Sequence, residues 1–146
     1  MKKKFGQNFL RNKEIINEII NIAEIDENSI IYEVGPGDGA LTKEIINKNP
    51  KKFLSVEIDL SLKNQLNSLF VKKEHTLLFT DALKFDETSH FIGDAVVIGN
   101  LPYNISLKLL IKWIYQHATK PWFKKMILMF QKEVAERIIS DENSKK

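Results

Sequence analysis

Five short apolar runs alternate with segments of helical periodicity, and this alternation limits the fold more than any other feature of the sequence. The runs predict strands at residues 30–34, 53–59, 75–80, 95–99 and 125–130. Helices are predicted at residues 13–23, 40–48 and 107–114, from Ser61 and from Lys132. Because strands separated by helices pair in parallel, we expect an α/β fold: a doubly wound, mostly parallel sheet with helices on both faces.

The length and composition suit one globular domain, which we expect to span residues 1–146. No apolar run approaches the ~20 residues of a membrane span, and the Lys-rich start lacks the apolar segment of a secretory signal. The chain has no cysteine, and its three histidines lack the spacing of metal ligands. We therefore expect a cytoplasmic protein with no membrane segment and no metal site.

The amino-terminal arm, residues 1–11, is basic and aromatic. The first thirteen residues hold five basic side chains and no acidic one: Lys2, Lys3, Lys4, Arg11 and Lys13. Such a cluster can contact phosphates, although a solvated terminus is the simpler interpretation of a lysine run. A frayed tail has no use for Phe5, Phe9 and Leu10, so we expect the arm to dock on the domain.

A glycine-rich loop at residues 35–39 joins the first predicted strand to a helix. Glycine permits a tight turn and a close approach of the backbone to a ligand, and N–H groups at a helix start can point at that ligand. This context makes Gly35, Gly37 and Gly39 candidate ligand-binding residues. Tight turns between a strand and a helix also use glycine for structural reasons alone.

Acidic residues end the next two strands. Glu57, with Asp59 as second choice, lies about 20 residues beyond the glycine loop, the spacing at which a carboxylate meets the ribose diol of a nucleotide. Asp59 could instead be solvated or cap the following helix. Asp81 follows the third strand.

The tetrapeptide Asn100-Leu101-Pro102-Tyr103 follows the fourth strand. The Asn100 side chain and a neighbouring backbone carbonyl can accept hydrogen bonds from an exocyclic amine, and Tyr103 offers an aromatic face. Pro102 stiffens the turn. A proline turn that caps a strand, with Tyr103 as a packing residue, accounts for these four residues about as well.

Parallel strands share their carboxyl ends, so the glycine loop, Glu57, Asp81 and Asn100 should meet along one edge of the sheet. That convergence predicts a cofactor site more strongly than any one motif does. A dinucleotide-dependent oxidoreductase would also use the relaxed glycine fingerprint, but it leaves the Asn100–Tyr103 element and the basic arm unexplained.

These motifs resemble, in kind and in order, those of the rRNA adenine dimethyltransferases. The matching segments are residues 4–10, 33–39, 56–59, 81–82, 100–106 and 131–134 with Arg137. Together they cover essentially the whole chain, and the similarity is greatest to the bacterial enzymes that act on the small subunit. The resemblance implies a Rossmann-like, class I fold that binds S-adenosyl-L-methionine and releases S-adenosyl-L-homocysteine. It also implies dimethylation of the N6 amines of two adjacent adenosines near the 3′ end of 16S rRNA.

The resemblance further implies a set of cofactor contacts: Asn8, Leu10, Gly35, Gly37, Gly39, Glu57, Asp81, Ala82 and Asn100. In that set the Glu57 carboxylate would accept hydrogen bonds from the ribose hydroxyls of the cofactor. Asp81, with Ala82 beside it, would accept from the amine of the cofactor's adenine.

The residues implied for the reaction itself are Asn100, Leu101, Pro102 and Tyr103. Asn100 and the Leu101 carbonyl would accept the hydrogens of the target amine and direct its lone pair. Tyr103 would stack on the extruded base. No general base of matched pKa is evident in the sequence.

Members of the resembled family are longer, with further strands and a small helical domain, so we expect this chain to be a truncated piece that stops after the fifth strand and its helix. The implied partner is 16S rRNA in an immature small ribosomal subunit, and we expect a monomer. A 23S rRNA adenine methyltransferase of the resistance type and a non-catalytic RNA-binding assembly factor stay open as alternatives.

Overall fold

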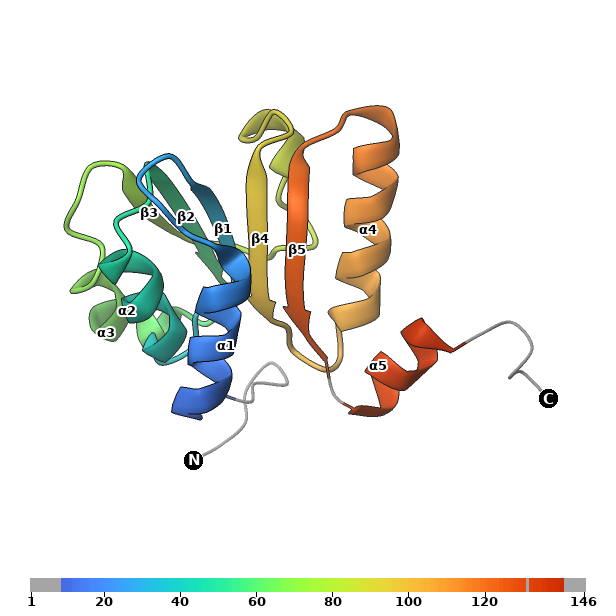
Figure 1. Cartoon of the computed structure of the whole chain (residues 1–146), viewed down its shortest axis with the longest axis horizontal. Coiled ribbons are helices and arrows are strands. Elements are labelled where there is room, and N and C mark those ends of the chain that lie inside the picture. Colours follow the sequence, from blue (N-terminus) through green and yellow to red (C-terminus); the bar gives the residue numbers. More distant parts are fainter. Residues whose placement is uncertain (1–8, 131, 141–146) are drawn as a thin grey trace.

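A computed structural model describes residues 9–130 and 132–140 of the chain. Its sheet has five parallel strands in the order β3-β2-β1-β4-β5 (Figure 1). The strands are β1 Ile30–Val34, β2 Lys52–Glu57, β3 His75–Phe79, β4 Ala95–Asn100 and β5 Phe123–Met129. The predicted parallel α/β class is confirmed.

Helices cover both faces of the sheet, as the doubly wound prediction requires. They are α1 Lys13–Ala23, α2 Ala40–Asn47, α3 Lys63–Asn67, α4 Ser106–Thr119 and α5 Lys132–Ile139, with 3-10 turns η1 Leu60–Leu62 and η2 Glu87–Ser89. Helices α1 and α2 pack in one apolar cluster, and α4 packs in the other (Figure 1). Among the described residues, no helix is long and apolar enough to cross a membrane.

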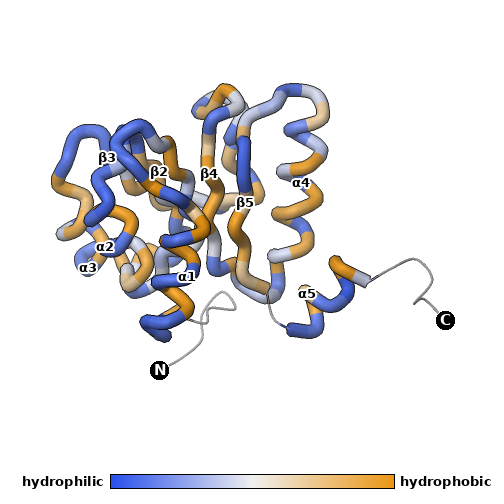
Figure 2. The backbone as a smooth tube through the Cα atoms, viewed as in Figure 1, coloured by the Kyte–Doolittle hydropathy of each residue, from blue (hydrophilic) through white to orange (hydrophobic). Residues whose placement is uncertain are grey.

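Alternation along the strands builds the two clusters. On β1, Tyr32 and Val34 face the α4 side, whereas Ile31 faces α1 and α2. Trp113 and Trp122 are fully buried in the α4 cluster and serve as packing residues there. Figure 2 shows β5 hydrophilic near its start and hydrophobic toward its carboxyl end. The hydrophilic part corresponds to Lys124 and Lys125 in the sequence.

Polar side chains at three element starts bond to nearby backbone groups. The carboxylate of Asp59 caps η1 by accepting from the backbone N–H of Ser61 at 3.0 Å, which is one of the alternatives that the sequence left open for Asp59. Ser106 lies inside α4 as its first residue, and its buried hydroxyl donates to the Tyr103 carbonyl at 3.4 Å. Asn12 caps α1 by accepting from the N–H groups of Glu14 and Ile15.

The strand order places a switch point between β1 and β4. The chain adds β2 and β3 on one side of β1 and then crosses to add β4 and β5 on the other. Loops after β1 and β4 therefore leave the sheet in opposite directions and part from each other, which is where open α/β sheets bind ligands.

Candidate active site

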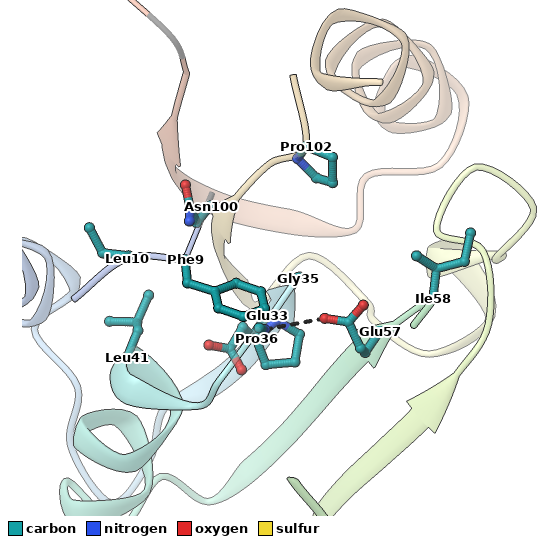
Figure 3. A pocket seen from close by; sticks show the side chains of 11 residues that line it. Phe9, Leu10, Glu33, Gly35, Pro36, Leu41, Glu57, Ile58, Asn100 and Pro102 are labelled. Atoms are coloured by element: carbon teal, nitrogen blue, oxygen red, sulfur yellow. Dashed lines mark hydrogen bonds between the residues drawn. The ribbon is translucent and has the colours of Figure 1, made fainter. Parts of the chain in front are cut away.

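Two adjoining pockets lie at the carboxyl ends of the strands. The larger, about 490 Å³ including open solvent, lies between the glycine loop and the amino-terminal arm (Figure 3). The smaller, about 300 Å³, extends toward the loop after β3. Four residues line both pockets: Gly35, Glu57, Ile58 and Pro102. We call the two pockets together the cleft.

The glycine loop forms the floor of the cleft because its backbone adopts positive φ angles. Gly35, Gly37 and Gly39 have φ values of 75°, 60° and 88°. A Cβ on Gly35 would lie 3.1 Å from the backbone oxygen of Asn100, so a side chain there would crowd the loop after β4. Gly39 ends the loop as the N-cap of α2 and packs against Leu69, so it supports the loop without lining either pocket.

Glu57 lies at the junction of the two pockets. Its carboxylate accepts from the backbone N–H of Gly37 at 3.2 Å (Figure 3). It also accepts from the backbone N–H of Asp59 at 2.9 Å. Burial raises the pKa of Glu57, while these backbone donors lower it. Each carboxylate oxygen can accept more than one hydrogen bond, so a hydroxyl pair at the junction could share these oxygens.

Asp81 and Ala82 line the smaller pocket from the loop after β3. The Asp81 carboxylate accepts from the Leu83 N–H at 3.0 Å, and the Asp81 carbonyl accepts from the Lys84 N–H at 2.9 Å. These two bonds close a tight turn. Apolar side chains, including Val56 and Ile105, form much of the remaining lining of this pocket, which suits the faces of a flat ring.

The tetrapeptide after β4 divides between the cleft and the surface. Asn100 lines the larger pocket and Pro102 lines both, whereas Leu101 is buried against the α4 cluster. Tyr103 lines neither pocket and is 53% exposed beside Pro102. Its predicted stacking role stays a prediction.

The arm closes one side of the larger pocket. Phe9 and Leu10 line it, and the Phe9 ring lies so near Gly37 that a Cβ there would be 2.8 Å from the ring (Figure 3). Arg11 pairs with Asp38 of the glycine loop at 2.7 Å, which ties the arm to that loop. The prediction that the arm docks is confirmed for residues 9–11. Asn8 and Lys2–Lys4 lie outside the described residues.

Sequence reasoning did not select Glu33 as a site residue. It lines the larger pocket, is 1% exposed, and accepts from the hydroxyls of Thr42 and Ser55 at 2.8 Å each. Burial, with Glu57 adding to it, raises the pKa of Glu33 to about 7, although the two hydroxyls lower it. A single carboxylate within the apolar strand run of residues 30–34 is the sequence signal that could have identified it.

Within residues 9–130 and 132–140, no group of acidic or histidine side chains could hold a metal ion. His75 and His90 contact backbone carbonyls, and His117 accepts from the Trp122 N–H at 3.1 Å. These three histidines therefore serve the packing of loops.

Comparison with known proteins connects the chain to one family. The family described as Ribosomal RNA adenine dimethylase matches residues 1–146. Ribosomal RNA small subunit methyltransferase A of Pelagibacter ubique is 44% identical over 98% of this chain and 54% of its own length. The protein of the same name from Mycoplasmopsis synoviae is also 44% identical, over 99% and 54%. The chain thus spans about half the length of the curated relatives it matches.

Solved structures show the same relationship. A dimethyladenosine transferase from Plasmodium falciparum superposes with a TM-score of 0.77 at 31% identity, covering 92% of this chain and 47% of the other. The 23S rRNA methyltransferase ErmE gives 0.71 at 26% identity, covering 88% and 50%. Since the family match extends over every residue, the chain belongs to the ribosomal RNA adenine dimethylase family.

Proposed function

We propose that the cleft binds S-adenosyl-L-methionine and that the protein dimethylates the N6 amines of two adjacent adenosines near the 3′ end of 16S rRNA. The observation that carries this proposal is the pair of adjoining pockets at the switch point, joined at Glu57 and bounded by Asn100 and Pro102. A second candidate, methylation of 23S rRNA, is favoured by the likeness to ErmE. The higher identity of the small-subunit relatives places it second.

The cleft fits the cofactor in parts. Gly35 leaves room for a close backbone approach, Glu57 offers acceptors for a ribose diol, and Asp81 can accept from an adenine amine. Leu10 would contact the methionine end, and Asn8 keeps its assignment from family resemblance. When bound, the sulfonium supplies an activated methyl group, so the protein's main task is alignment.

Asn100 and the Leu101 carbonyl are proposed to accept the hydrogens of the target amine. That arrangement would draw the nitrogen toward a pyramidal geometry and direct its lone pair into the cleft. Tyr103, exposed beside Pro102, would stack on the extruded base. We propose a cytoplasmic monomer that acts on immature small subunits through the domain of residues 1–146 and its basic arm.

Methyl transfer from labelled cofactor to immature small subunits tests the function. We expect transfer by the wild-type chain and at least a ~100-fold loss in Asn100→Ala and Tyr103→Ala, since each removes part of the alignment. Tyr115→Ala, which removes another exposed tyrosine, is the matched control and should keep full activity. Cofactor binding without any transfer would favour a non-catalytic assembly factor, and transfer only to 23S rRNA would favour the resistance-type enzyme.

A further inference from the structure

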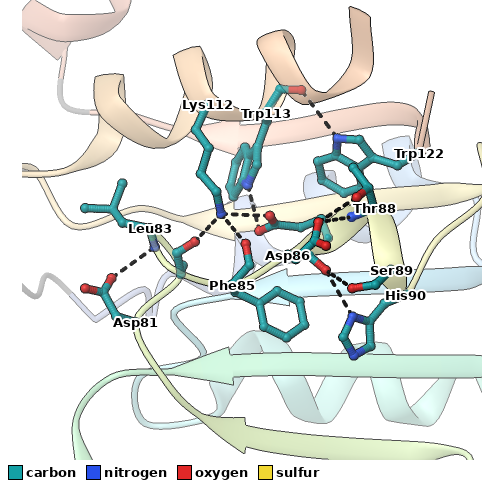
Figure 4. A network of polar contacts seen from close by, with 12 residues as sticks. Asp81, Leu83, Phe85, Asp86, Thr88, Ser89, His90, Lys112, Trp113 and Trp122 are labelled. Carbon is teal, nitrogen blue, oxygen red and sulfur yellow. Dashed lines mark hydrogen bonds and ion pairs between the residues drawn. The ribbon is translucent and has the colours of Figure 1, made fainter. Parts of the chain in front are cut away.

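Lys112 of α4 reaches the loop after β3, where it has three acceptors. Its ammonium donates to the carbonyl of Ala82 at 2.6 Å, to the carbonyl of Phe85, and to the carboxylate of Glu87 at 2.8 Å (Figure 4). An ammonium has three N–H donors, so these contacts use all of them. The side chain is only 20% exposed, which protects the bonds from competition by water.

The Ala82 carbonyl belongs to the same peptide unit as the Leu83 N–H. A trans peptide is planar, so its C=O and N–H point in opposite directions, and none of the described peptide bonds is cis. Lys112 binds one side of this unit, and the Leu83 N–H on the other side donates to the Asp81 carboxylate at 3.0 Å (Figure 4). By fixing the plane of this peptide, Lys112 fixes the donor that orients Asp81.

Glu87 anchors this arrangement in the core. Its side chain is fully buried, and its second oxygen accepts from the Tyr32 hydroxyl at 2.7 Å and from the Trp113 indole at 2.9 Å. Tyr32 lies on β1 and Trp113 on α4, so Glu87 connects the centre of the sheet to the helix that carries Lys112. The charge of Lys112 is thereby compensated at a fixed position.

We propose that Lys112 is a positioning residue for Asp81 and determines how strongly the cleft prefers a 6-amino purine over a 6-oxo purine in its cofactor. Lys112 acts through the Ala82–Leu83 peptide and does not line either pocket. The inference rests on the proposed function, because it assigns Asp81 to the adenine amine.

Two variants separate the positioning of Asp81 by Lys112 from the contribution of Lys112 to the stability of the fold. Glu87→Gln keeps the two bonds from Lys112 to the loop carbonyls. The double variant Glu87→Gln with Lys112→Met loses those bonds but leaves no unpaired charge in the core. Lys108→Met, an exposed lysine one turn earlier on α4, is the matched control.

The first measurement is calorimetric affinity for S-adenosylhomocysteine and for S-inosylhomocysteine, which carries a 6-oxo group. We expect wild type and Lys108→Met to share one preference for the adenosyl ligand, and Glu87→Gln, in which Lys112 still has its two carbonyl acceptors, to keep most of that preference. In the double variant this preference should be about tenfold smaller than in Glu87→Gln, which corresponds to ~1.4 kcal/mol. An equal loss of affinity for both ligands would mean a purely structural role and would overturn the inference alone. Absence of binding by the wild type would overturn the proposed function with it.

A second measurement needs no ligand. We expect amide hydrogen exchange of Leu83 to be about tenfold faster in the double variant than in Glu87→Gln, because the peptide loses its fixed orientation. An unchanged Leu83 rate, with the double variant folded, would also overturn the role assigned to Lys112.

Discussion

At the scale of single residues, the buried carboxylate of Glu33 gives the protein an unusual response to pH. Its pKa of about 7 in the folded state exceeds the ordinary value of 4.5, chiefly because of burial. Between these two values the folded state holds a proton that the unfolded state has released. Stability therefore falls as pH rises through this window, by on the order of 3 kcal/mol in total, and levels off above about pH 7.

Glu33→Gln should remove most of this pH dependence. Urea unfolding between pH 5 and pH 8 should give a much flatter stability profile for the variant than for the wild type. A smaller slope should stay, because burial raises the pKa of Glu57 in the same direction. Glu44→Gln, an exposed control on α2, should keep the wild-type slope. An unchanged slope in Glu33→Gln would show that Glu33 ionises normally in the folded protein.

At the scale of elements, the glycine loop and the loop after β4 limit each other. Gly35 combines a φ of 75° with a backbone oxygen 3.1 Å from the site of any added Cβ. The atom that an added Cβ would meet is a backbone oxygen of Asn100, so no flexible side chain could move aside to relieve the contact. The two loops at the switch point should therefore respond together to a change in either one.

Gly35→Ala should cost about 1–2 kcal/mol from the positive φ alone, and more from crowding against Asn100. Gly93→Ala is the matched control, because Gly93 has a φ of 92° but its added Cβ would meet nothing closer than 3.9 Å. Urea unfolding should show the larger loss in Gly35→Ala, and cofactor affinity should fall only in that variant. Equal losses of stability would mean that the loops relax apart without cost.

At the scale of the whole molecule, the strand order brings the proposed ligand contacts together at the carboxyl ends of the strands. Ligand bound there at about 100 times its dissociation constant should stabilise the chain by about 2.7 kcal/mol. The loops at the opposite ends of the strands include residues 24–29 and 120–122. None of these residues lines either pocket of the cleft.

Hydrogen exchange with S-adenosylhomocysteine should therefore show protection that is confined to one edge. We expect slower exchange at residues 35–39, 57–59, 81–85 and 100–103, and unchanged exchange at residues 24–29. Adenosine alone should protect the loop after β3 and Glu57 but not the arm, which gives an internal control for the two halves of the cleft. Equal protection of the loops at the carboxyl ends and at the amino ends of the strands would contradict binding at the switch point.

Much of this protein follows from the sequence by itself, because local periodicity and turn chemistry act within a few residues. The element types, the parallel class, the positive-φ glycine loop and the placement of Glu57, Asp81 and Asn100 at strand ends were all predictable. The family resemblance is confirmed as well. The individual cofactor and target contacts stay predictions.

Only the tertiary structure decided how distant segments meet. The order β3-β2-β1-β4-β5, the Phe9 ring over Gly37 and the enclosure of Glu33 by two hydroxyls depend on which strands pair. The bond from Lys112 to Ala82, 30 positions apart, is equally invisible in a local pattern. Periodicity specifies which face of an element is apolar, whereas the neighbour against which that face packs is set by the free energy of the whole assembled core.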